Sequence, residues 1–125
     1  MSNPAPIAVL SLRVSQNRAV VRKVHEAIQP YGYNISGILE SDPFSKSDLA
    51  LALRILEPPP AAVVVGRGYS DDEAAETRQV FAQFQKEVGI EKGTVIKITD
   101  EVFDRVGKEG VPKWVLEQLE AFFEK

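Results

Sequence analysis

The sequence predicts a small α/β domain with a mostly parallel β-sheet, and two observations support this prediction. Four short apolar runs, each bounded by glycine, proline or polar residues, occupy residues 7–12, 33–39, 61–65 and 94–98. Each run is followed by a segment whose apolar side chains recur at helical spacing. Strands that alternate with helices in this way are typical of parallel sheets covered by helices on both faces. We therefore expect a single three-layer domain over residues 1–125.

Composition limits the classes of function. The 125 residues are 44% hydrophobic, enough for one core that buries about two-thirds of the surface of the unfolded chain. With 15 Lys and Arg against 18 Asp and Glu, the net charge is −3, so no broad basic face exists and we expect no nucleic-acid partner. The chain contains no cysteine, which excludes disulfides, thiolate metal ligands and a cysteine nucleophile.

The beginning of the chain shows no targeting pattern. Residues 1–6 lack a basic start and contain two prolines, so we expect a flexible arm there. No apolar run approaches the roughly 20 residues of a membrane-spanning helix. We therefore expect a cytoplasmic protein with no membrane partner.

The first strand and helix have the strongest apolar pattern. Residues 7–12 begin with four apolar residues in a row, which is typical of a central strand buried on both faces. Residues 17–29 place apolar side chains on one face and charged ones on the other, so we expect an amphipathic helix. Gly32 ends this unit, because glycine adopts the left-handed conformation common just past a helix end.

The second unit is less apolar. Residues 33–39 include Asn34 and Ser36, which suits a strand nearer the edge of the sheet. A helix over residues 45–56 follows, with leucines on one face. The three prolines at 58–60 exclude helix and predict a stiff extended connection to the third strand.

The third unit has the clearest helix start. Residues 61–65 are wholly apolar and predict the second central strand. Ser70 and Glu73 have the spacing of a capping box, in which each side chain pairs with the other residue's backbone. The buried stripe of the helix that follows comprises Thr77, Val80, Phe81, Phe84 and Val88, and Gly89 ends it.

The fourth unit predicts an edge strand and two helices. Residues 94–98 alternate between apolar and polar side chains, and Lys97 would discourage further strand pairing. A short helix is expected over residues 101–106, then a loop over residues 107–110. Pro112 would lie in the first turn of the last helix, where proline is tolerated.

Right-handed crossovers between four such strands give the order 2-1-3-4, with helices on both faces of the sheet. This pattern resembles the flavodoxin-like architecture and, more broadly, Rossmann-like sheets. Ligands of such sheets bind outside the carboxyl ends of the strands, at the point where the strand order reverses. The resemblance therefore implies a ligand site between the first and third strands.

Three groups within this architecture were compared with the chain, and none matches in its chemistry. Flavodoxins carry a Ser/Thr-rich phosphate loop after the first strand, whereas residues 11–17 contain two serines and no glycine. Response-regulator receivers need acidic residues where this chain has Leu-Arg at residues 12–13 and Gly-Arg at residues 66–67. Dinucleotide-binding domains need Gly-x-Gly-x-x-Gly after the first strand. Here the Gly-x-Gly at residues 66–68 follows the third strand, and Asp71 occupies the position of the last glycine. No cofactor is identified by these comparisons.

The candidate site is an anion-binding crevice between the segments that follow the first and third strands. Each segment carries one arginine and leads toward a helix N-terminus, whose unpaired N–H groups favour phosphate or carboxylate. The residues proposed for this site are Arg13, Ser15, Asn17, Gly66, Arg67, Gly68, Tyr69 and Ser70. The alternative interpretation is that the serines are helix caps, the glycines are turn residues and the arginines are solvated.

Titratable residues near this crevice have ordinary structural explanations. Asp71, Asp72 and Glu73 would repel an anion unless they point away, and acidic residues commonly stabilise the first turn of a helix. We expect no metal site, although Asp42 with Asp72 is a minor alternative for a divalent cation. The single histidine, His25, lies on the first helix, and no serine of the chain lies in a Gly-x-Ser-x-Gly motif, so a Ser/His/Asp triad is disfavoured.

Two functions of different classes remain. The first is the binding of an anionic small molecule at the Arg13 and Arg67 crevice, with or without a reaction. The second is a non-catalytic interaction or regulatory module with a receiver-like fold that lacks a phosphorylation site. It would form a homodimer, or bind another protein chain, through Trp114, Phe122 and Phe123 on the last helix, because aromatic residues are enriched in interface cores. The alternative for these three aromatic residues is ordinary core packing.

Overall fold

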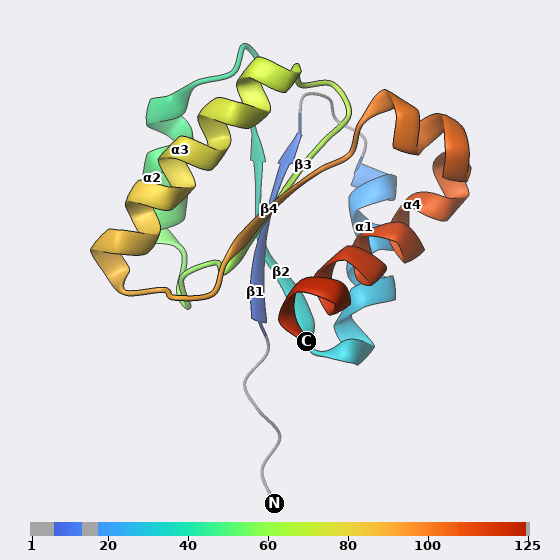
Figure 1. The fold of residues 1–125 in the computed structure, drawn as a ribbon, viewed down its shortest axis with the longest axis horizontal. Coiled ribbons are helices and arrows are strands. Elements are labelled where there is room, and N and C mark those ends of the chain that lie inside the picture. Colours follow the sequence, from blue (N-terminus) through green and yellow to red (C-terminus); the bar gives the residue numbers. More distant parts are fainter. Residues whose placement is uncertain (1–6, 14–17, 125) are drawn as a thin grey trace, which may run out of the picture.

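A four-stranded, fully parallel sheet in the order β2-β1-β3-β4 confirms the predicted fold. The computed structural model describes residues 7–13 and 18–124, so the expected arm at residues 1–6 lies outside it. The helices cover both faces of the sheet, with α1 and α4 on one face and α2 and α3 on the other (Figure 1). The elements are β1 (Ile7–Arg13), α1 (Arg18–Ile28), the 3₁₀ turn η1 (Gln29–Tyr31), β2 (Tyr33–Glu40), α2 (Lys46–Ile55), β3 (Ala62–Val65), α3 (Asp71–Val88), β4 (Thr94–Lys97) and α4 (Asp100–Phe123).

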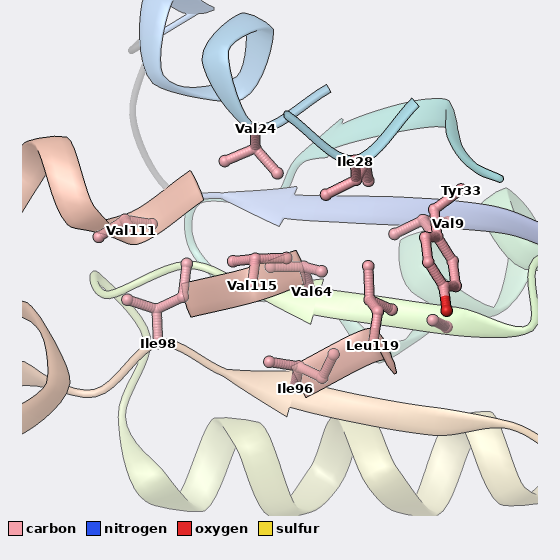
Figure 2. Close-up of a cluster of buried hydrophobic side chains, with 11 residues drawn as sticks. Val9, Val24, Ile28, Tyr33, Val64, Ile96, Ile98, Val111, Val115 and Leu119 are labelled. Carbon is pink, nitrogen blue, oxygen red and sulfur yellow. The ribbon is translucent and has the colours of Figure 1, made fainter. Parts of the chain in front are cut away.

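The two central strands divide the core into two halves. Side chains of β1 and β3 point alternately to the two faces of the sheet, as in any strand. One half lies between the sheet and helices α1 and α4, and it includes Val9, Val24, Val64, Ile98 and Leu119 (Figure 2). The other half lies between the sheet and helices α2 and α3, and it includes Leu10, Leu12, Val63, Phe81 and Phe84. Because both faces of these strands are covered, their sequences are almost continuously apolar.

A β-bulge in β2 changes which face its last residues occupy. Val9 is paired with Ile35, but the next residue of β1 is paired with Gly37, so one residue of β2 has no partner. A one-residue shift reverses the alternation of side chains beyond it. Glu40 thereby lies opposite Arg13 and on the same face of the sheet, which is the face covered by α1 and α4.

Helix α4 consists of two segments that meet at Gly107. This glycine has φ 73° and ψ 168°, a backbone conformation that is almost exclusive to glycine. The predicted loop over residues 107–110 is wrong, because the chain is helical again from Lys108. Glycine at position 110 allows the helix to resume this close to the preceding segment. A side chain there would clash with Val106, because its Cβ would lie 2.9 Å from the Cβ of Val106. Pro112 consequently falls about one turn after the kink, later than the first-turn position that the sequence predicts.

Candidate functional site

A cavity of about 400 Å³ opens at the edge of the sheet toward which the strand arrows point in Figure 1. It lies at the carboxyl ends of β1 and β3, where the strand order reverses. Its lining residues are Ser11, Leu12, Arg13, Val20, Val21, Val24, Ile35, Val64, Gly66, Arg67, Gly68, Ile98, Phe103, Lys108 and Val111. The fold thus brings four of the eight proposed site residues to one cavity, namely Arg13, Gly66, Arg67 and Gly68. Ser15 and Asn17 lie outside the described residues.

Arg13 is the most unusual residue of this cavity. Its side chain is 8% exposed, and its Nη2 donates a hydrogen bond to Oε1 of Glu40 in an ion pair. The Nε and Nη1 atoms are buried and have no hydrogen-bond partner among the described residues. Those two atoms carry three N–H donors, and buried donors in proteins are nearly always satisfied. The guanidinium therefore has unused capacity for an acceptor.

Arg67 forms part of the rim of the cavity. Its guanidinium carbon lies 4.0 Å from the centroid of the Phe103 ring, a cation–π arrangement. Its Nε lies 3.6 Å from Oδ1 of Asp100, whose side chain is 85% exposed. The side chain of Arg67 is itself 48% exposed, so water screens this pair strongly. Arg67 is thus held by the first segment of α4 while remaining accessible from solvent.

Lys97 holds the backbone of the turn that carries Arg67. Its Nζ donates to the carbonyl oxygens of Gly66 at 3.0 Å and Ile98 at 2.8 Å, and lies 3.4 Å from that of Arg67. Burial lowers the pKa of this ammonium group. The sequence indicated only that Lys97 would protect an edge strand. Its additional role depends on β3 and β4 being neighbours.

Tyr69 lies apart from the cavity. Its ring belongs to the core half beneath α2 and α3, and its hydroxyl lies 2.7 Å from the carbonyl oxygens of both Arg13 and Ser41. The single hydroxyl proton is shared between these two acceptors. Tyr69 therefore joins the ends of β1 and β2 and fixes the backbone of Arg13 from the opposite face of the sheet.

We expect Tyr69 to make the fold sensitive to alkaline pH. Burial raises the pKa of Tyr69 to about 12, whereas an unperturbed tyrosine has 10.0. Above pH 10 the unfolded chain loses this proton while the folded chain keeps it, so the free energy of unfolding should fall by about 1.4 kcal/mol per pH unit up to pH 12. Tyr69→Phe should remove this contribution and, at pH 7, cost about 1 kcal/mol for the lost hydrogen bonds.

Urea unfolding of the wild type and Tyr69→Phe between pH 7 and 11.5 measures both effects. Burial also raises the pKa of Tyr33, which acts in the same direction as Tyr69. The lowered pKa of Lys97 acts in the opposite direction, because the unfolded chain then holds that proton more tightly. The contributions of Tyr33 and Lys97 are the same in the wild type and in Tyr69→Phe, so they cancel when these two proteins are compared. Tyr31→Phe is the matched control, because the Tyr31 ring is 60% exposed. Equal slopes above pH 10 in the wild type and Tyr69→Phe would contradict the prediction.

The side chain of Ser70 caps the N-terminus of α3. Its Oγ accepts a hydrogen bond from the backbone N–H of Glu73 at 3.1 Å, and Oε1 of Glu73 accepts one from the N–H of Ser70 at 2.8 Å. The predicted capping box at the start of α3 is therefore present. Asp71 and Asp72 follow in the exposed first turn, and the cavity lining includes none of these acidic residues.

Sequence reasoning did not include several other groups that line the cavity. Phe103 and Lys108 come from α4, on either side of the Gly107 kink. Glu40 lies outside the lining, where the bulge in β2 places it against Arg13. The Ser36-Gly37 interruption in β2 was visible in the sequence, and it is the signal that could have indicated the bulge.

The three aromatic residues proposed for the dimer interface do not share one environment. Phe123 packs on Tyr33 with ring centroids 6.0 Å apart, and on Phe122 with centroids 4.8 Å apart. Trp114 and Phe122 line a second, open hollow of about 500 Å³ beside β4. The homodimer through Trp114, Phe122 and Phe123 stays a prediction.

In the described part of the chain, His25 and the carboxylates show no arrangement that indicates a metal. Nδ1 of His25 accepts a hydrogen bond from the backbone N–H of Ile35 at 3.3 Å. Among the described residues, no group of three histidine, aspartate or glutamate side chains is placed to hold a metal ion. Within that same part of the chain, no helix combines the length and the apolar character needed to cross a bilayer.

Comparisons with known proteins returned no relative. No protein-family model matches the chain, and no curated protein or solved structure matches it.

Proposed function

We propose that this protein binds an anionic small molecule in the cavity between Arg13 and Arg67. The observation that supports this most directly is the buried guanidinium of Arg13, whose Nε and Nη1 have no partner among the described residues. An anion that accepts hydrogen bonds from these atoms would satisfy donors that are costly to leave unpaired in a protein interior.

The charges around the cavity favour the same function. Three cationic side chains line it, from Arg13, Arg67 and Lys108, and its described lining contains no carboxylate. Glu40 and Asp100 pair with the two arginines from outside the lining. Positive charge in a cavity with apolar walls attracts an anion more strongly than the same charge on an open surface.

Binding, rather than a particular reaction, is what we propose. Ser11 is the one hydroxyl side chain of the described lining, which contains no histidine, cysteine or carboxylate. Nucleophilic catalysis by serine requires an adjacent general base. The lining gives Ser11 no such partner, and we assign no catalytic residue.

Replacing Arg13 with methionine tests the proposed function. We expect Arg13→Met to weaken anion binding by about 10- to 100-fold, because hydrogen bonds to a charged group contribute about 1.5–3 kcal/mol. Binding can be measured by NMR titration of the isotope-labelled protein with acetate, 3-methylbutanoate and inorganic phosphate. Arg67→Met provides a second variant at the rim if Arg13→Met folds poorly.

Arg54→Met is the matched control. Arg54 also pairs with a glutamate, Glu87, but both side chains are more than one-third exposed and neither lines the cavity. This variant should bind anions as the wild type does. Unchanged affinity in both Arg13→Met and Arg67→Met, or a wild type that binds none of the three anions, would refute the proposed function.

A further inference from the structure

We infer that the anion is a monocarboxylate with a compact apolar body, either a branched aliphatic or an aromatic acid. This inference rests on the proposed function and specifies its ligand class. Four features of the cavity lead to it: its apolar walls, its charge balance, its donor geometry and its size.

The walls of the cavity are apolar apart from the cationic groups and the Ser11 hydroxyl. Aliphatic side chains from α1, β2, β3 and α4 line it, together with Ile98 and the Phe103 ring. Figure 2 shows Val24, Val64, Ile98 and Val111 projecting into the space between the sheet and helices α1 and α4. Sugar hydroxyls placed against these walls would lose their hydrogen bonds to water without replacement, which is unfavourable. An apolar body gains free energy from the same contacts.

The charge balance favours a single negative charge. Glu40 pairs with Arg13, and Asp100 lies near Arg67, so each arginine already has a carboxylate neighbour. Lys108 lines the cavity and has no carboxylate partner among the described residues. One positive charge is thus left uncompensated, which one carboxylate would balance, whereas a phosphate carrying two charges would exceed it.

The donors of Arg13 suit a planar acceptor. Nη2 donates to Glu40, while the buried Nε and Nη1 have no partner among the described residues. Nη2 carries two N–H groups, one on the Nε edge and one on the Nη1 edge, so the edge that Glu40 does not use presents two parallel donors to a single planar acceptor. A guanidinium and a carboxylate are both planar and form short, directional hydrogen bonds. Backbone N–H groups arranged as a glycine-rich phosphate cradle would favour phosphate instead, but the segment after β1 contains no glycine through residue 17. Gly66 and Gly68 line the cavity after β3, yet the N–H groups of Gly66 and Tyr69 there already donate to backbone carbonyls.

The size of the cavity favours a small body. Ligand pockets range from about 300 to 1,000 Å³, and this cavity, at about 400 Å³, is near the lower end. Arg13 is buried whereas Arg67 is half exposed. The carboxylate would therefore lie at Arg13 with the apolar body against Val24 and Val64, leaving no room for a dinucleotide.

The test compares ligands that share one end of the proposed molecule. NMR titrations of the labelled wild type would use acetate, 3-methylbutanoate, 3-methylbutanamide and inorganic phosphate. The three additional carbons of 3-methylbutanoate should make it bind about 50-fold more tightly than acetate, given the gain per buried methylene group. It should also bind at least about 10-fold more tightly than its neutral amide, which lacks the charge.

Two neighbouring valines provide matched variants. Val64 lines the cavity, whereas Val63 is buried on the opposite face of β3, and valine and threonine differ little in size. Val64→Thr places a hydroxyl against the apolar body and should weaken 3-methylbutanoate about 5- to 10-fold while leaving acetate unchanged. Val63→Thr puts the same hydroxyl in the other core half and should leave both affinities unchanged.

The outcomes separate the inference from the proposed function. Tighter binding of 3-methylbutanoate than of acetate and phosphate, reduced by Val64→Thr alone, supports both. Binding of phosphate in preference to both carboxylates, or equal affinity for acetate and 3-methylbutanoate, overturns the inference and retains the proposed anion site. If 3-methylbutanamide binds as tightly as 3-methylbutanoate, the negative charge does not contribute to binding and the inference of a carboxylate ligand is overturned. If none of the ligands binds, both the inference and the proposed function are overturned.

Discussion

Glu40→Ala should lower the free energy of unfolding by about 2–3 kcal/mol at pH 7, because it leaves the charge of Arg13 buried without a partner. Arg13 is 8% exposed and pairs with Glu40, whose side chain is 36% exposed. Removing one member of a fully buried ion pair costs about 3–5 kcal/mol. The partial exposure of Glu40 places the expected loss at or below the lower end of this range.

The same substitution should strengthen the effect of a bound anion. With Glu40 absent, the Nη2 N–H group that it engages becomes available in addition to the unpartnered Nε and Nη1 of Arg13. An anion that binds only the folded state stabilises it by mass action. The increase in melting temperature caused by a fixed concentration of 3-methylbutanoate should therefore be larger in Glu40→Ala than in the wild type.

An exposed ion pair supplies the control for Glu40→Ala. Glu87 accepts hydrogen bonds from Nε and Nη2 of Arg54 at 3.0 and 2.7 Å, and the two side chains are 37% and 43% exposed. Exposed pairs contribute about 0.2–1 kcal/mol, so Glu87→Ala should cost less than 1 kcal/mol and leave the anion effect unchanged. Urea unfolding with and without the anion measures both quantities. Equal losses in Glu40→Ala and Glu87→Ala would contradict the assignment of a buried, functionally relevant pair.

The fold could be predicted because its main determinants are local. The apolar residues of β1 and β3 indicate strands covered on both faces, and the helical spacing after each strand requires a crossover that is right-handed. These two facts give the order β2-β1-β3-β4 without reference to any individual side-chain contact. The ends of β1 and β3, and with them Arg13 and Arg67, then fall at the reversal of strand order.

The details of the site could not be predicted because they depend on register and on long-range contacts. Arg13 and Glu40 are neighbours only because the β2 bulge reverses the alternation of side chains. Tyr69 follows Arg67 closely in the sequence, yet the turn between β3 and α3 directs its ring to the opposite face of the sheet. No local pattern fixes that direction, since a turn residue has no periodicity. Lys108 reaches the cavity only through the Gly107 kink and the packing of α4 beside α1.

Phe84→Ala should produce the largest loss of stability of the variants considered, about 3–5 kcal/mol, the usual cost of removing a fully buried aromatic ring. Phe84 is completely buried in the core half beneath α2 and α3. Its ring centroid lies 6.2 Å from that of Phe81, and the guanidinium carbon of Arg54 lies 5.9 Å from it. Alanine would leave a cavity among these neighbours that the close-packed sheet and helices fill only in part.

The sheet separates this loss of stability from ligand binding. The anion cavity lies on the α1 and α4 face, and Phe84 is not among its lining residues. Substitutions at distant sites without shared partners act additively, so 3-methylbutanoate should add the same free energy of unfolding to Phe84→Ala as to the wild type. Val88 is 45% exposed at the end of the same helix, so its assignment to the buried stripe from the sequence is wrong. Val88→Ala should therefore cost less than about 1 kcal/mol. A loss of anion binding in folded Phe84→Ala would show that the two core halves are coupled through β1 and β3, and would contradict the placement of the site on one face.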